Sequence, residues 1–335
     1  MNFLKKGGQL ITPLPAWPTK LLRLAKRLTP SALAIDLAKR PFMKTSRTTT
    51  FLLGLALALG AAGCTTPKLA QQKRVVYGER HDHELAYEFM QPRKTNGLGV
   101  VVMVSGSWRS DPDDFKPMMG QAFLRRGYSL FAVSHLSQPK ATIPEIYDDV
   151  TRAVQHIREH AGEYGVDPGQ LGVVGASAGG HLSLMVATRG KETTGKPDGL
   201  VRAVAIFFPV TDVLKPANPD KTENDGGPLK RFRKLFGIDP DDLDAWSRIG
   251  RELSPLYHVD ADTPPVLIIH GDDDDVVSFQ QSEWYIEAAK KHGATAKLIR
   301  KRGKGHGWAT ILWDIRKFAN WFDEHLEPPV QPSGR

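Results

Sequence analysis

The chain has 335 residues, of which 41% are hydrophobic and 24% charged, a composition typical of globular proteins rather than of disordered chains or membrane channels. Its formal net charge of +8 arises near the N-terminus: residues 1–63 contain ten Lys or Arg and one acidic residue, whereas residues 64–335 contain 35 basic and 36 acidic residues. The bulk of the chain therefore lacks the basic excess of nucleic-acid-binding proteins, and its single cysteine excludes an intramolecular disulfide and metal sites built from several thiolates.

Residues 43–63 have the layout of a secretory signal peptide. The basic stretch MKTSRTTT, which begins at Met43, is followed by the apolar run FLLGLALALGAA and then by Gly63 and Cys64. That run is shorter than the roughly 20 residues that a transmembrane helix needs. The ending AAGC resembles a bacterial lipoprotein box, so we expect cleavage before Cys64, its acylation, and a lipid-anchored protein of the cell envelope. An ordinary cleaved signal peptide, which would make the protein secreted, and an uncleaved signal anchor are the alternatives.

The segments on either side of this signal are less regular. Residues 1–42 are basic and contain Leu21, Leu24 and Leu28 at helical spacing. Two interpretations are open: translation starts at Met43 and this region is an over-extended reading of the gene, or it forms a basic amphipathic helix at a membrane surface. Residues 64–74 are polar, and we expect them to form a tether.

Residues 75–327 alternate short apolar runs with longer helical patterns, which predicts an α/β domain with a mostly parallel central sheet flanked by helices. The runs predict strands at 83–90, 99–104, 128–134, 170–174, 201–208, 265–270 and 295–301. Apolar helix faces lie within 146–157 and 311–322. Residues 213–250 break the rhythm, and we expect a small insertion over the active site with short helices around Leu235 and Leu243. Residues 328–335 form a tail.

A G-x-S-x-G motif follows the predicted strand at 170–174 and precedes a helical pattern. In this context the serine, Ser177, stands on a turn so tight that side chains two positions away would meet neighbouring backbone, and Gly175 and Gly179 remove that collision. The alternative is a glycine-rich turn that binds phosphate at a helix N-terminus. The chain has neither the P-loop pattern nor the G-x-G-x-x-G pattern in that region. We therefore interpret Ser177 as a nucleophile.

A serine nucleophile needs a base and a carboxylate that orients it, and both residue types follow later strands. The strand at 265–270 is followed by the run Asp272 to Asp275, and the strand at 295–301 by Gly305-His306-Gly307. Parallel sheets place their sites at these carboxyl ends, and the order Ser, Asp, His matches the chain order in α/β-hydrolases. The aspartate run also has a metal-binding interpretation, although calcium loops alternate ligands with other residues.

On these residues the chain resembles the serine α/β-hydrolase superfamily over roughly residues 83–325. The segments HGDDDDVV, from His270 to Val277, and Gly305-His306-Gly307 resemble its esterase and prolyl-oligopeptidase-like branches. The resemblance implies that Asp274 orients the base His306, with Asp273 and Asp275 as alternative registers. It also implies packing or hydrogen-bonding roles for His181 and His270.

Such enzymes stabilise the oxyanion with two backbone N–H groups. The resemblance implies that one belongs to Ala178, directly after the nucleophile, and the other to the loop after the strand at 99–104. This loop reads SGSW and resembles the His-Gly-Gly-Gly-Trp loop of lipases and esterases, with Val in place of the His and Ser in place of two glycines. Ser107 is our choice for the second donor, with Gly106 and Trp108 as alternatives. Trp108 is equally expected to form a wall of the substrate pocket.

Together these observations predict a serine carboxylic ester hydrolase that acts through an acyl-enzyme and needs no cofactor and no metal. We expect a small-molecule or glycan ester as substrate, with acetyl to butyryl groups preferred, and no nucleic-acid partner. The oligomeric state is not predicted. Two alternatives remain: a peptidase of the prolyl-oligopeptidase-like type, and a non-catalytic envelope binding protein on a hydrolase scaffold.

Overall fold

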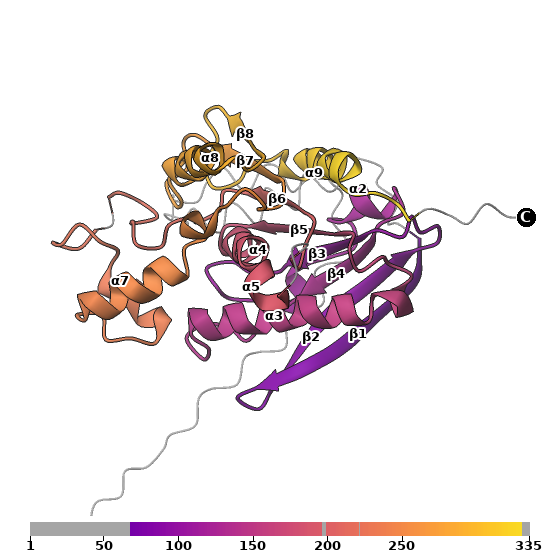
Figure 1. The fold of residues 1–335 in the computed structure, drawn as a ribbon, viewed down its shortest axis with the longest axis horizontal. Helices are drawn as coiled ribbons and strands as arrows, with labels where there is room; N and C mark the ends of the chain where they lie inside the picture. Colours follow the sequence, from indigo (N-terminus) through magenta and orange to yellow (C-terminus); the bar gives the residue numbers. More distant parts are fainter. Residues whose placement is uncertain (1–67, 196–198, 221, 330–335) are drawn as a thin grey trace, which may run out of the picture. The chain divides into compact units, whose positions relative to one another are not determined.

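The computed structural model describes residues 68–195, 199–220 and 222–329 (Figure 1). The proposed signal peptide, Cys64 and residues 1–42 lie outside the described residues. One eight-stranded sheet has the strand order β1-β2-β4-β3-β5-β6-β7-β8. Its strands are β1 Leu69–Arg80, β2 His83–Pro92, β3 Gly99–Met103, β4 Ser129–Val133, β5 Leu171–Ala176, β6 Ala203–Phe207, β7 Val266–Gly271 and β8 Ala296–Lys301.

Strands β3 to β8 are parallel, and they account for six of the seven predicted strands; the seventh is β2, which pairs antiparallel with β4. Successive residues of the central strands face opposite sides of the sheet. In β3, Val101 and Met103 belong to one buried cluster, and Val100 and Val102 to the other. Because both faces are covered, these strands are continuous apolar runs, which is why the sequence revealed them.

Two layers of helices cover the sheet (Figure 1). The side chains of α3 (Ile143–Glu159) and α4 (Ala178–Thr188) contribute to one core cluster, together with buried residues of α8 (Gln280–His292). The opposite cluster contains side chains of α2 (Gln121–Leu124) and α9 (Ile311–His325). Three further short helices precede β6: η2 Pro112–Asp114, η3 Ala161–Tyr164 and α5 Gly190–Thr194. No helix among the described residues combines the length and apolar character needed to cross a bilayer.

The predicted tether is wrong for residues 69–74, because they form the first half of β1. This edge strand pairs antiparallel with β2 along its whole length. Its sequence, LAQQKRVVYGER, is mostly polar, and its exposed and half-buried residues alternate only loosely. Backbone hydrogen bonding to β2 needs no apolar side chains, so composition alone did not reveal the strand.

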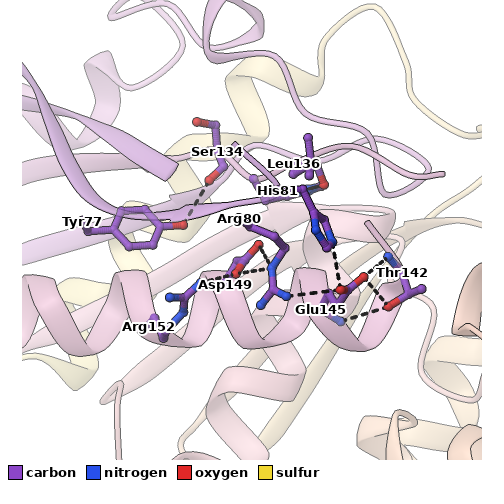
Figure 2. Close-up of polar contacts among 10 residues, drawn as sticks. Tyr77, Arg80, His81, Ser134, Leu136, Thr142, Glu145, Asp149 and Arg152 are labelled. Atoms are coloured by element: carbon purple, nitrogen blue, oxygen red, sulfur yellow. Dashed lines mark hydrogen bonds and ion pairs between the residues drawn. The ribbon is translucent and has the colours of Figure 1, made fainter. Parts of the chain in front are cut away.

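The β1–β2 hairpin is anchored to α3 by a polar cluster (Figure 2). The fully buried carboxylate of Asp149 accepts hydrogen bonds from Arg80 Nε at 2.8 Å and from Arg152 Nη2 at 2.5 Å. Glu145, which also closes the N-terminal capping box of α3, contacts Arg80 Nη1 at 3.3 Å and His81 Nε2 at 3.1 Å. The cluster fixes the end of the hairpin to the helix that lies under it, because removing one partner would leave a buried charge.

The predicted insertion at 213–250 contains the expected short helices. These are α6 (Lys230–Arg233), η4 (Lys234–Phe236) and α7 (Leu243–Glu252), followed by η5 (Pro255–His258). The segment connects β6 to β7. It therefore leaves the sheet at the end of β6, the strand next to β5, after which Ser177 lies. Its aromatic core consists of Phe232, Phe236 and Trp246, whose ring centroids are 5.0 to 6.2 Å apart.

Candidate active site

Ser177 occupies a strained turn between β5 and α4. Its φ of 55° and ψ of −119° lie outside the regions that residues with a side chain ordinarily adopt. Its N–H donates to the Phe207 carbonyl at the end of β6 (3.0 Å), and its carbonyl accepts from the His181 N–H (2.9 Å). These two hydrogen bonds hold the half-buried serine at the carboxyl end of a central strand.

The glycines around Ser177 have the steric role that the motif predicts. A Cβ on Gly175 would lie 2.3 Å from the Gly179 carbonyl oxygen, and a Cβ on Gly179 would lie 2.5 Å from the Met103 carbonyl oxygen. Both obstacles are backbone atoms, which cannot rotate away as a flexible side chain can. The turn therefore accepts only glycine at these two positions.

Asp274 and His306 are brought together by the ends of β7 and β8. Asp274 Oδ2 lies 2.8 Å from His306 Nδ1. Of the four consecutive aspartates, Asp274 is therefore the one whose carboxylate contacts the histidine. Asp272 instead accepts hydrogen bonds from Arg300 Nε and the Gly303 N–H, both at 2.6 Å, and so ties the two loops together.

The Asp274 carboxylate is fully buried and fully hydrogen-bonded. Its Oδ1 accepts from the N–H groups of Val276 and Val277, both at 2.9 Å, and its Oδ2 also contacts His270 Nε2 at 3.2 Å. Burial by itself would raise the pKa of Asp274, but the hydrogen bonds from His270 and His306 outweigh it and hold the pKa well below its usual range. Asp274 is thus an anion at neutral pH, the form that orients an imidazole.

His270 has the buried, hydrogen-bonded position expected for it, and it contacts Asp274 directly. Its Nδ1 lies 2.7 Å from Ser282 Oγ, and its Nε2 lies 3.0 Å from the Val277 carbonyl oxygen. A carbonyl only accepts, so Nε2 carries the proton and faces Asp274, while Nδ1 accepts from the Ser282 hydroxyl. This tautomer gives Asp274 a second imidazole donor.

His306 is held against an aromatic ring that the sequence analysis did not identify. The rings of His306 and Phe208 lie 4.3 Å apart between centroids, and Phe208 itself has a φ of 33°. The Phe208 N–H donates to the Ile269 carbonyl of β7 at 3.1 Å, which fixes this strained residue. Sequence analysis missed Phe208 because a positive φ is usually signalled by glycine, and this turn after β6 contains a phenylalanine instead.

Ser177 follows β5 and His306 follows β8, and residues at the end of β6, which lies between these strands, contact both. The Phe207 carbonyl accepts the Ser177 N–H, and the ring of the next residue, Phe208, packs at a tilt against the ring of His306. Within the described residues no hydrogen bond joins Ser177 Oγ to His306, so this contact of a Ser–His–Asp triad is open in the structure. Such hydrogen bonds are often long before substrate binds and shorten in the complex.

The loop after β3 carries the three candidates for the second oxyanion donor, and its hydrogen bonds engage one of them. The Gly106 N–H is already donated to the Arg109 carbonyl at 2.9 Å, so the prediction of Gly106 as a donor is wrong. Ser107 and Trp108 have positive φ values of 51° and 53°, so the backbone turns sharply here. Among the described residues the Ser107 N–H donates no hydrogen bond, and it is therefore free to serve as the second donor. As the first residue of α4, Ala178 has an N–H group without a partner inside the helix.

A buried histidine links this loop to the nucleophile helix. His135, which follows β4, places Nε2 2.9 Å from Ser105 Oγ and Nδ1 3.0 Å from the Leu136 carbonyl oxygen. Burial lowers the pKa of His135, so it is neutral at pH 7. The Ser105 carbonyl in turn accepts the Gly179 N–H at 3.1 Å. Sequence analysis missed His135, although its place just past a parallel strand was an available signal.

Trp108 forms a wall of the site and is itself fixed by His181. Its Nε1 donates to His181 Nδ1 at 3.3 Å, and His181 Nε2 donates to the Leu253 carbonyl at 2.8 Å. Burial lowers the pKa of His181 to about 4, so the ring stays neutral and accepts the indole hydrogen bond. The Trp108 ring also packs 5.6 Å from Phe232 of the insertion. Trp108 therefore connects the oxyanion loop with the insertion.

Two pockets flank the nucleophile turn. The first, which we name the Ser177 pocket, has a volume of about 340 Å³ and is lined by Ser107, Trp108, Gln138, Ser177, Val210, Lys215, Pro216, Ala217, Asn218, Pro228, Leu229, Arg231, Phe232, Leu235, Val276 and Val277. The second has a volume of about 260 Å³ and lies on the other side of the oxyanion loop. It is mostly apolar, with Phe115, Met119 and Phe318 in its wall.

The site combines a strained serine between a strand and a helix with an aspartate–histidine pair at the ends of two later strands. This arrangement is typical of serine α/β-hydrolases, and the chain has their fold. Within that class the family is also defined. The BD-FAE family matches residues 88–288, and the chain belongs to it. The match includes Ser177 and Asp274 and ends before His306.

Individual relatives agree with this assignment. The chain is 29% identical over 170 residues to a probable carboxylic ester hydrolase, LipM, and 25% identical over 248 residues to the esterase LipQ, both of Mycobacterium tuberculosis. These matches cover 49% and 71% of this chain but only 38% and 57% of the relatives. A solved truncated form of a carbohydrate esterase from gut microbiota is similar with a TM-score of 0.63 and 25% identity, over 78% of this chain and 99% of that one.

Proposed function

We propose that this protein hydrolyses carboxylic esters through an acyl-enzyme on Ser177. The observation that carries the proposal is the 2.8 Å hydrogen bond between Asp274 and His306, placed beside a serine in a strained strand-to-helix turn. The esterases among its relatives and the carbohydrate esterase of similar structure support the choice of esters over peptides.

In the first half-reaction, Ser177 Oγ attacks the ester carbonyl carbon while His306 Nε2 takes the hydroxyl proton. The carbonyl π electrons move to oxygen, and the N–H groups of Ala178 and Ser107 stabilise the resulting oxyanion. Asp274 holds Nδ1–H and stabilises the imidazolium. When the intermediate collapses, the C–O bond to the alcohol breaks, and His306 returns the proton to the leaving oxygen.

In the second half-reaction, water takes the place of the alcohol. His306 removes one proton from the water, whose oxygen attacks the acyl carbon and forms a second oxyanion at the same two N–H groups. Collapse breaks the bond to Ser177 Oγ, which regains its proton from His306, and the carboxylic acid leaves. The protein residues return to their starting protonation states, so no cofactor enters the balance.

We further propose that the acyl group is short, from acetyl to butyryl, and that the alcohol belongs to a small molecule or a glycan. The two pockets beside Ser177, about 340 and 260 Å³ in volume, lie at or below the lower end of the usual size range of ligand sites, which supports a compact substrate. One of the proteins of similar structure is a carbohydrate esterase, which favours a glycan ester.

The test of this function is a panel of p-nitrophenyl esters from acetate to octanoate, assayed beside an aminoacyl p-nitroanilide. We expect ester turnover with kcat/KM highest between acetyl and butyryl, and no measurable cleavage of the anilide. Anilide cleavage with a comparable kcat/KM would indicate a peptidase instead. A kcat/KM that rises steadily to the octanoyl ester would contradict the short-acyl preference, and folded protein inactive on every ester would indicate a binding protein.

We also propose that the protein is exported and anchored to a bacterial envelope membrane through a lipid on Cys64. The support is the sequence alone, namely the basic stretch and the apolar run before Cys64. Residues 64–335, with 35 basic and 36 acidic residues, offer little electrostatic attraction to an anionic membrane. An anchor would therefore have to be hydrophobic.

Membrane fractions of a bacterial host that expresses the chain check this proposal. We expect the protein to be released by detergent and not by high salt, because each buried CH₂ of an acyl chain contributes about 0.8 kcal/mol. Cys64→Ser should block lipidation and normal processing. Soluble protein whose N-terminus is unmodified and lies beyond Cys64 would contradict the anchor.

A further inference from the structure

The Ser177 pocket has a one-sided charge. Of its described lining residues, the only charged ones are the cations Lys215 and Arg231, and none is acidic. The rest of the wall is apolar or neutral, with Trp108, Phe232 and Leu235 as its large side chains. Positive charges beside an apolar wall in a cleft concentrate the electric field there, because the wall displaces water that would screen them.

Two of the other basic residues of the insertion are neutralised by acidic partners. Lys230 forms an ion pair with Asp241, and the fully buried Arg233 forms one with Asp225 at 2.7 Å. Within the described part of the chain, Lys215 and Arg231 form no ion pair. The acid nearest the chemistry, Asp274, is buried behind His306 with both of its oxygens hydrogen-bonded, and it does not line the pocket.

Arg231 is presented to the pocket by a rigid support. It belongs to α6, in which the next residue but one, Arg233, donates from Nε to the Pro228 carbonyl at 3.0 Å and from Nη1 to the Pro240 carbonyl at 3.3 Å. The Arg233 guanidinium also lies over the Trp246 ring, 5.9 Å from its centroid. These buried contacts fix the backbone of α6, so Arg231 is held beside the pocket before any ligand binds.

Lys215 is held by the segment that leaves β6. Thr211 and Asp212 donate their N–H groups to Gln281 Oε1, both at 2.8 Å, and Val213 donates to Ser254 Oγ at 2.9 Å. The next N–H, that of Leu214, donates to Asp212 Oδ1 at 3.0 Å. Four consecutive fixed residues thus bring Lys215 to the mouth of the Ser177 pocket.

We infer that the natural ester carries a carboxylate group a few atoms from the scissile carbonyl, bound by Lys215 and Arg231. This inference rests on the proposed esterase function and names its substrate class. A carboxylate near the reacting carbonyl repels the negative oxygen that develops in the transition state. Two cations at the pocket wall offset that repulsion, and a guanidinium matches the planar geometry of a carboxylate.

The experiment compares two pairs of esters that differ in one negative charge. The first pair, 4-acetoxybenzoate and its methyl ester, carries the charge on the alcohol side, and release of the acetyl group is measured. The second pair, methyl hydrogen succinate and dimethyl succinate, carries it on the acyl side. For each pair the measured quantity is the ratio of kcat/KM for the anionic ester to kcat/KM for the neutral ester.

We expect this ratio to exceed one for at least one pair. Lys215→Gln and Arg231→Gln should each lower it about two- to fivefold, and the double variant about tenfold, as expected for exposed ion pairs. Raising NaCl from about 0.05 to 0.5 M should lower the ratio for the parent protein and not for the double variant. Lys234→Gln is the matched control, because it removes a charge from the same insertion outside the pocket, and it should leave the ratio unchanged.

The outcomes separate the two proposals. If neutral esters are cleaved but the ratio is one or less for both pairs, or the double variant leaves it unchanged, the carboxylate assignment is overturned and the esterase function stands. An equal fall with Lys234→Gln would also overturn it, because the effect would then come from the net charge of the protein. If the folded protein cleaves none of the four esters, both proposals fail.

Discussion

Replacing Ser177 with alanine is expected to abolish covalent labelling by a fluorophosphonate probe and to lower kcat for p-nitrophenyl acetate by about 10⁶. The substitution removes the only atom that forms the acyl-enzyme in the proposed mechanism. The strained backbone of residue 177 is held by the hydrogen bonds of its own N–H and carbonyl, so the fold should persist. Labelling is read by intact-protein mass spectrometry, and folding by circular dichroism.

Ser129→Ala is the matched control for this prediction. Ser129 begins β4, at the opposite end of the sheet from Ser177, and its buried hydroxyl has no hydrogen-bond partner among the described residues. Removing it should leave both labelling and turnover intact. Retained single-site labelling in Ser177→Ala would mean that another residue is the nucleophile.

Asp274→Asn is expected to lower kcat by about 10⁴ with little change in KM. The N–H groups of Val276 and Val277 require an oxygen at the position of Oδ1, so the new amide NH₂ must face His306 Nδ1. Two donors cannot share a hydrogen bond, and Nδ1 would have to become the acceptor. The proton would then sit on Nε2, and His306 could no longer accept the proton of Ser177.

Asp273→Asn and Asp275→Asn remove the same charge from the same run and serve as controls. Each should change kcat far less than Asp274→Asn does, because the hydrogen bond to His306 Nδ1 comes from Asp274. Steady-state kinetics on p-nitrophenyl acetate, together with the thermal midpoint of each variant, distinguish a lost tautomer from a lost fold. A larger loss at Asp273 or Asp275 would refute the role of Asp274.

Features that depend on near neighbours in the chain were predictable. Strands β3 to β7 are mostly apolar because both faces of the sheet are covered there, so they stood out as runs in the sequence. The turn at Ser177 carries part of its cause within five residues, because a Cβ on Gly175 would meet the Gly179 carbonyl oxygen; the limit on Gly179 comes from the Met103 carbonyl oxygen of β3. Helix α7 begins at Leu243, where the sequence analysis expects a short helix.

Features that depend on pairing between distant segments were not predictable in the same way. Strand β1 is polar, and it exists because β2 offers unpaired backbone groups along its edge. Gly106 was a reasonable oxyanion donor until the fold directed its N–H to Arg109. Phe208 and His135 support the site from strand ends where no motif marks them.

The sequence by itself therefore determined the fold class and the residue types of the proposed chemistry: Ser177, an aspartate and His306. Buried strands appear as apolar runs, and the nucleophile turn appears as a short glycine motif, so both can be recognised from neighbouring residues. Only the tertiary structure decided which aspartate contacts His306, since the two residues are 32 positions apart and meet where two loops fold together. It also decided the charge of the Ser177 pocket. Lys215 and Arg231 are ordinary basic residues in the sequence, and they became a shared feature when α6 and the segment after β6 lined one cavity.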